Sequence, residues 1–315
     1  MKLFSWFRNL NGFQKTSLIT IVLTFFLIVV GSFVRVSGAG LGCPDWPKCF
    51  GMWIPPTSAS ELPAEYDAAE FNPVHTWSEY VNRLVGVLVG FMITVTFIRS
   101  FFYRKQTPAV FYSSALAFAL VLFQGWLGGQ VVQSGLVDWV ITIHMVVALL
   151  IVNVLMYAFF KAMSGRLSFK LNDTQVQAMK WIVIPLLIVT LLQIILGAQV
   201  REALEGISNA YPDLERAAWI NEVGWIDQIH RTASWLVLGF GIWLWYRARN
   251  FGAPIQMTRL SMVINALILL QIIGGIILVY FGLPPAFMTI HLLAASMLIA
   301  FQFLFYLMLK HADPA

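Results

Sequence analysis

The sequence predicts an all-α integral membrane protein with eight transmembrane helices arranged as two pseudo-twofold-related four-helix bundles. Three observations predict this class: 59% of the 315 residues are hydrophobic and 11% are charged, long apolar segments fill most of the chain, and its two halves resemble each other. Soluble domains are about a quarter charged, so this composition excludes an ordinary soluble enzyme. A content of 25 Phe and 12 Trp excludes a disordered chain. The basic residues behind the net charge of +5 are scattered between apolar runs, so no nucleic-acid partner is expected.

Eight apolar segments are close to the ~20 residues that a helix needs to cross a bilayer. They lie at residues 16–37, 79–98, 109–131, 139–160, 179–200, 226–246, 258–281 and 286–309. The first is not expected to be a cleaved signal peptide. It is longer than a typical signal region, and Val34-Arg35-Val36 follows it in place of a small-residue cleavage site.

Lys and Arg residues predict the orientation of the helices, because cytoplasmic loops carry an excess of both. Of the 20 basic residues, 14 fall on one predicted side: Lys2, Arg8, Lys15, Arg99, Arg104, Lys105, Lys161, Arg166, Lys170, Lys180, Arg247, Arg249, Arg259 and Lys310. Among the acidic residues only Asp173 and Asp313 share that side. We therefore expect a multi-pass protein of the plasma (inner) membrane with both termini in the cytoplasm. The loops 38–78 and 201–225 are expected to face outward.

The two halves repeat at a nearly constant offset, which predicts a domain at 1–165 and another at 166–315. Four helices per half is an even number, so both copies have the same orientation and are related by an axis along the membrane normal. The matching segments are Gly31–Arg35 with Gly197–Arg201, Glu79–Arg83 with Asp227–Arg231, Gln124 and Gly128 with Gln271 and Gly275, and His144 with His291.

Of the five histidines, three lie inside predicted helices at repeat-related positions: His144, His230 and His291. A single intramembrane His often makes only a hydrogen bond to a neighbouring helix. Three at equal depth favour a cofactor. Zinc would need converging Cys or carboxylate ligands, which the sequence does not offer. Two imidazoles from different helices are typical of haem ligation, so His230 and His291 predict a b-type haem in the second half. His311 is expected to be solvated in the cytoplasmic tail.

The first half has Asn82 where the repeat predicts a histidine, and Asn is a poor iron ligand. Glu79 shares a helical face with Asn82, as Asp227 does with His230. Either carboxylate could simply be solvated at the membrane edge. Arg83 and Arg231 follow the ligand positions directly. We expect them to bind haem propionates through bidentate contacts, and snorkelling to lipid headgroups is the alternative.

Cys43 and Cys49 lie in the first outward loop, in the segment Gly42-Cys-Pro-Asp-Trp-Pro-Lys-Cys. That compartment is oxidising, so a disulfide is expected. So short a ring stabilises the fold little through loop entropy. A redox role, a lid-shaping role and a purely structural role therefore remain open.

These residues resemble the haem A synthase family. The resemblance covers nearly the whole chain and rests on residues 38–51, the Glu-x-x-(His)-Arg pattern at 79–83 and the histidines at 144, 230 and 291. It implies oxidation of the C8 methyl group of haem O to the formyl group of haem A for terminal oxidases. It further implies a haem b held by His230 and His291, substrate haem at His144, and a part in the oxidation for Glu79. The paired cysteines of the family correspond to Cys43 and Cys49.

The sequence departs from the family at Asn82, which replaces the usual substrate-side histidine, and it lacks a cysteine pair in the second outer loop. His75 is the only other candidate histidine, about two turns from Asn82, although it follows Pro73 and could lie in the loop. We expect His144 to be the only protein ligand, because an open sixth position suits oxygen chemistry. Asn82 could then hydrogen-bond a bound oxygen species or water.

Two further functions stay open: a membrane b-type cytochrome that carries electrons from quinol, and a haem-binding transporter or assembly factor. The loss of a ligand at Asn82 favours these alternatives. Expected partners are haem O and an electron donor that the sequence does not identify, with haem O synthase or oxidase assembly factors as further candidates. The sequence is also compatible with an oligomer.

Overall fold

The computed structural model describes residues 6–69 and 71–312, and every long element within these residues is an α-helix. The chain divides into two compact units, Met1–Ala162 and Met163–Ala315. The predicted domain boundary at 165/166 lies close to this division. Which haem belongs to which domain, and the twofold relation between the domains, stay predictions.

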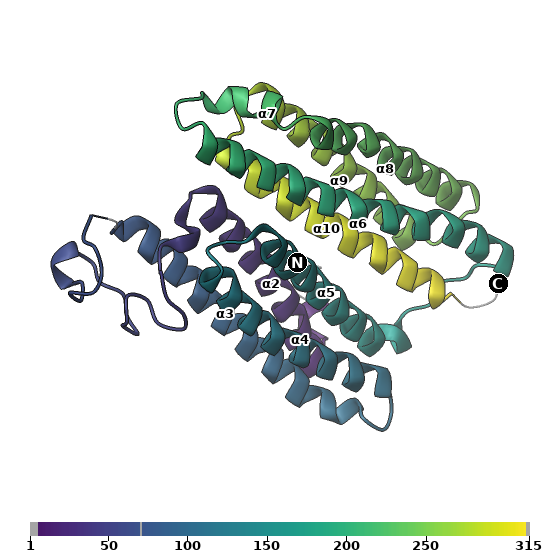
Figure 1. Cartoon of the computed structure of the whole chain (residues 1–315). Coiled ribbons are helices and arrows are strands. Elements are labelled where there is room, and N and C mark those ends of the chain that lie inside the picture. Colours follow the sequence, from purple (N-terminus) through teal and green to yellow (C-terminus); the bar gives the residue numbers. More distant parts are fainter. Residues whose placement is uncertain (1–5, 70, 313–315) are drawn as a thin grey trace. The chain divides into compact units, whose positions relative to one another are not determined.

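The first unit contains four long helices, which Figure 1 shows in purple to teal. Asn11 caps the first through a capping box with Gln14, and Asn72 caps the second, with Pro73 as its first residue. The first helix packs on the second and the second on the third, and a hydrogen bond from Gln124 to the carbonyl of His144 joins the third to the fourth. The fourth helix returns to the first, where Gln14 Nε2 donates to the carbonyl of Ala162 at 2.7 Å. The helices are α2 (Gly12–Val36), α3 (Pro73–Ser100), α4 (Pro108–Gln133) and α5 (Asp138–Met163).

In the second unit four long helices close a ring, because α6 packs on α8, α8 on α9, α9 on α10, and α10 on α6 (Figure 1). The approach of α8 to α9 is close at Gly241, where any side chain would overlap Ile268. Gln302 Nε2 donates to Thr190 Oγ1 at 3.0 Å and joins α10 to α6. The helices are α6 (Asp173–Ala210), α8 (Trp225–Asn250), α9 (Ile255–Tyr280) and α10 (Pro285–Lys310), with the short α7 (Trp219–Glu222) before α8.

By length and apolar composition, seven helices among the described residues could cross a membrane: α2, α3, α4, α5, α6, α9 and α10. Large apolar side chains such as Val22, Val87 and Phe91 are exposed on them, as expected for surfaces that contact lipid. The remaining long helix, α8, occupies the predicted span 226–246 but is less apolar. Its first turns carry Asp227, His230 and Arg231, among other polar residues. An eighth span therefore stays a prediction.

The prediction of a loop over 201–225 is wrong in its first part, because α6 continues to Ala210. At 1.5 Å per residue its 38 residues span about 57 Å, well beyond the ~30 Å hydrocarbon core. The extra turns are stabilised by helix-forming residues and by an ion pair between Arg201 and Glu205 at 3.5 Å. In the same way α3 begins at Pro73, before the predicted residue 79.

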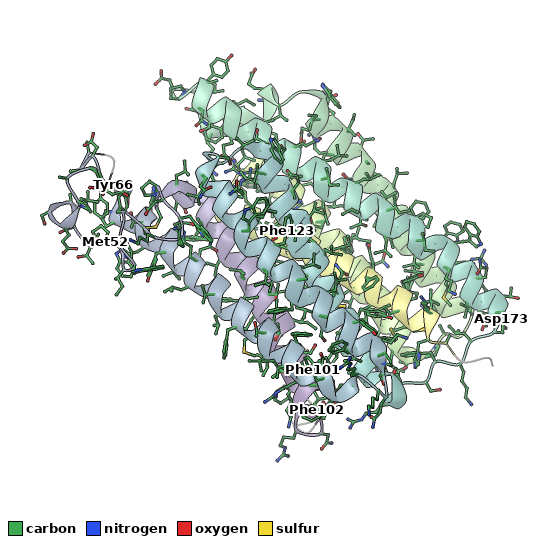
Figure 2. The ribbon with its side chains drawn as sticks, turned by 60° about the horizontal axis from the view of Figure 1, so that its bottom comes forward. Met52, Tyr66, Phe101, Phe102, Phe123 and Asp173 are labelled. Carbon is green, nitrogen blue, oxygen red and sulfur yellow. A yellow bond between two sulfur atoms is a disulfide. The ribbon has the colours of Figure 1, made fainter. Side chains whose placement is uncertain are left out.

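Between α2 and α3 lies a long connecting segment with two short 3₁₀ helices, Ala39–Leu41 and Ala59–Glu61. The predicted disulfide between Cys43 and Cys49 is present. Figure 2 shows Met52 and Tyr66 of this segment at the end of the unit opposite Phe101 and Phe102. The buried disulfide and Phe50 form a small apolar cluster, against which pack Met52, Leu62, Tyr66, Phe71 and Tyr80.

Candidate functional site

The two histidines predicted to bind haem b come from opposite helices of the second unit's ring. His230 is the sixth residue of α8, and His291 is the seventh residue of α10. Because α8 and α10 each pack on α6 and α9, residues on their inner faces lie across the interior from one another. Each histidine thus lies near the start of its helix, and the two helices stand on opposite sides of the ring.

A glutamine on a neighbouring helix holds the backbone at each histidine. Gln193 Nε2 of α6 donates to the carbonyl of His230 at 2.9 Å, and Gln271 Nε2 of α9 donates to the carbonyl of His291 at 2.7 Å. Each bond fixes the helix register at the histidine, because a buried amide donor without a partner would be costly. The sequence repeat identified Gln271, but it gave no sign of the role of Gln193.

A glycine lies against each of these imidazole rings. A Cβ built on Gly197 would lie 3.1 Å from Cε1 of His230, and one on Gly274 would lie 3.1 Å from Nδ1 of His291. Contacts this short are tighter than ordinary packing, so a larger residue would push the ring away. The glycines thus hold each imidazole between its own helix and the next.

The donor set of the second unit fits a haem. Nδ1 of His291 is buried and has no hydrogen-bond partner among the described residues. Two neutral imidazoles from opposite helices of an apolar bundle are the usual axial pair of a b-type haem. The two rings, each held against a glycine of a neighbouring helix, therefore support the predicted ligand pair.

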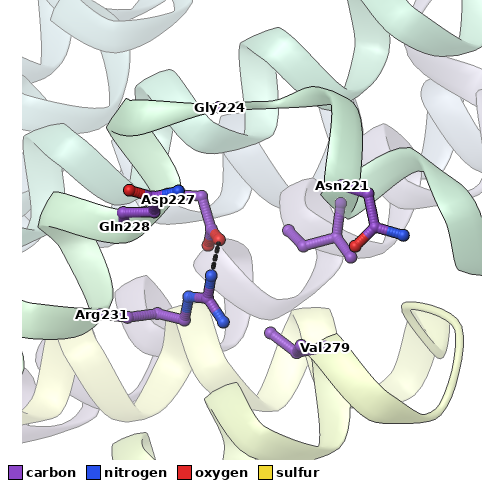
Figure 3. A pocket seen from close by; sticks show the side chains of 7 residues that line it. Asn221, Gly224, Asp227, Gln228, Arg231 and Val279 are labelled. Carbon is purple, nitrogen blue, oxygen red and sulfur yellow. Dashed lines mark ion pairs between the residues drawn. The ribbon is translucent and has the colours of Figure 1, made fainter.

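Next to His230, a small pocket of about 150 Å³ contains the predicted propionate-binding arginine. Arg231 Nη2 pairs with Asp227 Oδ2 at 2.7 Å, as Figure 3 shows. The Arg231 side chain is 49% exposed, whereas that of Asp227 is 5% exposed. Asp227 is therefore buried and paired rather than solvated at the membrane edge. The lining residues are Ile220, Asn221, Gly224, Asp227, Gln228, Arg231 and Val279.

The first unit repeats this arrangement at His144, the seventh residue of α5. Gln124 Nε2 of α4 donates to the His144 carbonyl at 3.0 Å. A Cβ built on Gly128 would lie 3.4 Å from Cε1 of the ring, and Nδ1 is buried with no hydrogen-bond partner among the described residues. His144 thus has the same glutamine and glycine neighbours as His230 and His291.

The fourth position of this kind belongs to Asn82 on α3. Its glycine is kept, since a Cβ on Gly31 would lie 3.6 Å from Asn82 Oδ1. Its glutamine is lost, because the residue that corresponds to Gln193 in the repeat is Leu27. Asn82 instead donates from Nδ2 to Glu79 Oε2 at 3.5 Å, a long hydrogen bond. At this position the histidine is thus replaced by Asn82, and the glutamine that would hold its backbone is replaced by Leu27.

Glu79 is buried, with 6% of the residue exposed, so it is not solvated at the membrane edge. Its Oε1 pairs with Arg83 Nε at 3.0 Å. The terminal nitrogens of Arg83 donate to three carbonyls of the disulfide loop between α2 and α3, those of Cys43, Asp45 and Lys48. These contacts and the ion pair use four of the five guanidinium N–H donors, so a bidentate propionate contact would have to displace one of them. The propionate role of Arg83 stays a prediction.

The remaining two histidines lie away from these positions. His75 is in the first turn of α3 rather than in the loop, and the backbone N–H of His75 donates to the capping side chain of Asn72 at 3.2 Å. The expectation that His311 is merely solvated is wrong. Its ring nitrogen lies 3.1 Å from the carbonyl of Ser164, and its ring packs edge-on against Phe169.

Comparison with known proteins places this geometry in a family. The family model COX15-CtaA, described as cytochrome oxidase assembly protein, matches residues 14–303. The chain belongs to this family. Together with the apolar helices, this membership makes it a multi-pass membrane protein.

Several curated relatives of this family member carry the name Heme A synthase. The relative from Shewanella oneidensis is 25% identical and covers 89% of this chain and 92% of its own. The relative from Wolbachia pipientis wMel is 26% identical and covers 98% of this chain and 97% of its own. A further relative, from Wolbachia pipientis subsp. Culex pipiens, is 27% identical over 84% of this chain and 88% of its own. The predicted membership of the haem A synthase family is confirmed.

Proposed function

We propose that the protein is a haem A synthase, an oxidoreductase that converts the C8 methyl group of haem O to the formyl group of haem A. Its membership of the family and its relatives named Heme A synthase support this function. The observation that carries it is the set of repeat-related positions at which a glutamine and a glycine hold a histidine. A haem with two histidine ligands and a second haem with a single histidine ligand would together require three such positions.

In the second unit, His230 and His291 would hold a resident haem b, and Arg231 would pair with one of its propionates. When bound, this haem supplies one-electron transfer. The half-exposed guanidinium of Arg231, which has Asp227 as its partner, supports the propionate role. The chain's own contribution is to fix the two imidazoles through Gln193 and Gln271.

In the first unit, His144 would hold the iron of the substrate haem O, and no protein side chain would occupy the opposite face. Asn82 supports this arrangement, because an amide is a poor iron ligand and its side chain already contacts Glu79. The amide and the carboxylate, which contact each other, would then lie together on the side of the substrate that His144 does not occupy.

Glu79 is the proposed catalytic residue. Oxidising a methyl group to a formyl group replaces two hydrogens of the carbon by one oxygen atom; as a half-reaction it takes up one water and releases four electrons and four protons. A group that accepts protons is therefore needed near the ring. Glu79 is buried and has two side-chain partners, Arg83 at Oε1 and Asn82 at Oε2. A carboxylate in such a site can hold a proton at one oxygen while its position is kept by the other contact.

We place the protein in the plasma membrane with eight spans, both termini in the cytoplasm and the two bundles related by a pseudo-twofold axis. The basic residues and the repeat support this topology. In that orientation the disulfide segment lies on the outer side, where disulfides persist. The electron donor is a separate partner.

Chemical identification of bound haems tests the function. The protein is expressed with a source of haem O, purified, and its haems are extracted and separated, with His144→Ala as the matched control. We expect haem B together with haem A in the wild type, and haem B alone in the control. The replacement of a histidine by Asn82 favours one alternative, an electron carrier. If the protein is an electron carrier, the wild type should yield haem B alone. Unchanged haem O would instead indicate a haem-binding transporter or assembly factor.

A further inference from the structure

The outer loop closed by the disulfide directs three backbone carbonyls at one guanidinium. Arg83 Nη1 donates to the carbonyls of Asp45 and Lys48, both at 2.8 Å. Arg83 Nη2 donates to the carbonyl of Cys43 at 3.3 Å. Two of these carbonyls lie inside the ring that the disulfide closes and the third belongs to Cys43 itself, so the ring acts as a receptor for the arginine.

Other contacts fix the shape of this loop and its position on α3. Asp45 carries a carboxylate that accepts from the backbone N–H of Phe50 at 2.6 Å and of Gly51 at 3.0 Å. Thr76 Oγ1 donates to the Gly42 carbonyl at 2.8 Å. Gly42 lies so close to the backbone of α3 that any side chain there would overlap it. The loop therefore rests directly on the first turns of the helix that carries Glu79.

The other end of the same guanidinium holds Glu79. Arg83 Nε donates to Glu79 Oε1 at 3.0 Å, and the two side chains are 13% and 8% exposed. A guanidinium has five N–H donors, and the four contacts leave one. A bidentate contact with a propionate needs two. The Arg83 guanidinium therefore links the carbonyls of the disulfide loop to the carboxylate of Glu79.

We propose that Arg83 is a positioning residue that locks the disulfide loop onto α3 and thereby fixes the catalytic carboxylate Glu79. This inference rests on the proposed function of Glu79. It assigns the cysteine pair a role as well: the disulfide shapes the carbonyl receptor that holds Arg83. The repeat offers a contrast, because Arg231 makes an ion pair with Asp227, and the described residues that line its pocket include no cysteine.

The first test measures the loop directly, without any haem chemistry. The full-length protein in detergent is treated with an excess of a phosphine reductant, which takes up oxygen from water as the disulfide gains two electrons and two protons. The free thiols are then counted with a maleimide over time. The variants are Arg83→Gln and Arg83→Lys, and the matched control is Arg231→Gln.

We expect reduction to be about tenfold faster or more in Arg83→Gln, because hydrogen bonds from a charged donor contribute enough for such a factor. Arg83→Lys should fall between, since an ammonium cannot span three carbonyls and a carboxylate. Arg231→Gln should match the wild type. Equal rates in wild type, Arg83→Gln and Arg83→Lys would overturn the proposal. If Arg83→Gln does not accumulate in the membrane, Arg83→Lys carries the comparison.

The second test asks whether Arg83 acts through Glu79. Formyl production per bound haem O and the amount of bound haem O are measured for Arg83→Gln, Glu79→Gln and the double variant. A positioning role predicts slower formyl production with haem O retained in Arg83→Gln, and a double variant no slower than Glu79→Gln alone. Loss of haem O with an unchanged rate per bound haem would overturn it in favour of a propionate contact.

The two tests separate this inference from the proposed function. Full activity of Glu79→Gln would remove Glu79 as the catalytic carboxylate, and the reduction rates would still report whether Arg83 locks the loop. Conversely, a steep loss of activity in Glu79→Gln together with equal reduction rates would keep the function and reject the lock.

Discussion

The same sequence motif is used differently in the two units. In each unit a buried acidic residue forms an ion pair with an arginine four residues later on the same helix, Glu79 with Arg83 and Asp227 with Arg231. In the first unit the arginine is almost covered and donates to three loop carbonyls. In the second unit its side chain is 49% exposed and lines a pocket. The repeat has thus kept the pair while changing what the arginine is available to bind.

The residue that directly precedes the arginine also differs between the two units: it is Asn82 in the first and His230 in the second. His230 has a glutamine on its carbonyl and a glycine on its ring. Asn82 keeps only the glycine. A four-position arrangement with one altered member suits a protein in which one haem is a fixed cofactor and the other is a substrate that must be exchanged. A single axial bond is easier to break than two.

The largest expected effect concerns the second unit. His230→Ala or His291→Ala should abolish the low-spin b-type absorbance of the purified protein, because each removes one of the two axial imidazoles. Absorbance and magnetic spectra of the reduced and oxidised protein measure this directly. Retention of the full low-spin signal in both variants would show that the haem b assignment is wrong, and with it the comparison between the units.

The next effect distinguishes the two carboxylates. Glu79→Gln keeps shape and hydrogen bonding but cannot accept a proton, so formyl production should fall about a hundredfold or more while haem O stays bound. Asp227→Asn, the matched change in the second unit, should reduce formyl production only a few-fold through its effect on Arg231. The rates are measured per bound haem O. Equal losses in the two variants would mean that the motif has one role in both units.

A smaller effect is expected from making the first unit resemble the second. Asn82→His supplies a second imidazole, and adding Leu27→Gln supplies the amide that holds the backbone of such a residue in the second unit. The double variant should convert the substrate site to a six-coordinate, low-spin form and slow formyl production, as seen in its absorbance spectrum and turnover. Asn82→Ala should be milder. A double variant with unchanged spectrum would show that Asn82 does not lie at an axial position.

The smallest effect concerns the glycine at a ligand. Gly197→Ala places a Cβ about 3.1 Å from the His230 ring, so it should shift the ring and weaken haem b retention. Gly239→Ala, in the same unit, has nothing within 4 Å of the added atom and serves as the control. It should leave haem b unchanged and favour the helix by about 1 kcal/mol. Equal haem retention in both variants would mean that the glycine does not fix the imidazole.

Much of this arrangement was predictable because apolar length and the repeat act on long stretches of sequence. The apolar segments predicted the places of the helices, and the histidines at 144, 230 and 291 lie near the starts of α5, α8 and α10. The disulfide was predictable because both cysteines lie in a loop that the basic residues predict to face outward. The end of α6 was missed because charged residues such as Arg201, Glu202 and Glu205 lower the hydropathy after residue 200 but are compatible with a helix.

The contacts of individual side chains could not be predicted from the sequence. Gln193 has no repeat partner of its own type, so nothing marked it as the donor to the carbonyl of His230. The role of Arg83 depends on where a proline-containing loop folds back, which no local pattern fixes. Both residues became visible only when the loop and the helices were placed in three dimensions.

The central claim is that the two units bind haem through different ligand sets, two imidazoles in one and His144 alone in the other. Electron paramagnetic resonance of the oxidised protein loaded with haem O measures this most directly. We predict one low-spin and one high-spin ferric signal in equal amounts, with His291→Ala removing only the first and His144→Ala only the second. Two low-spin signals in the wild type, or a high-spin signal that survives in His144→Ala, would contradict the account.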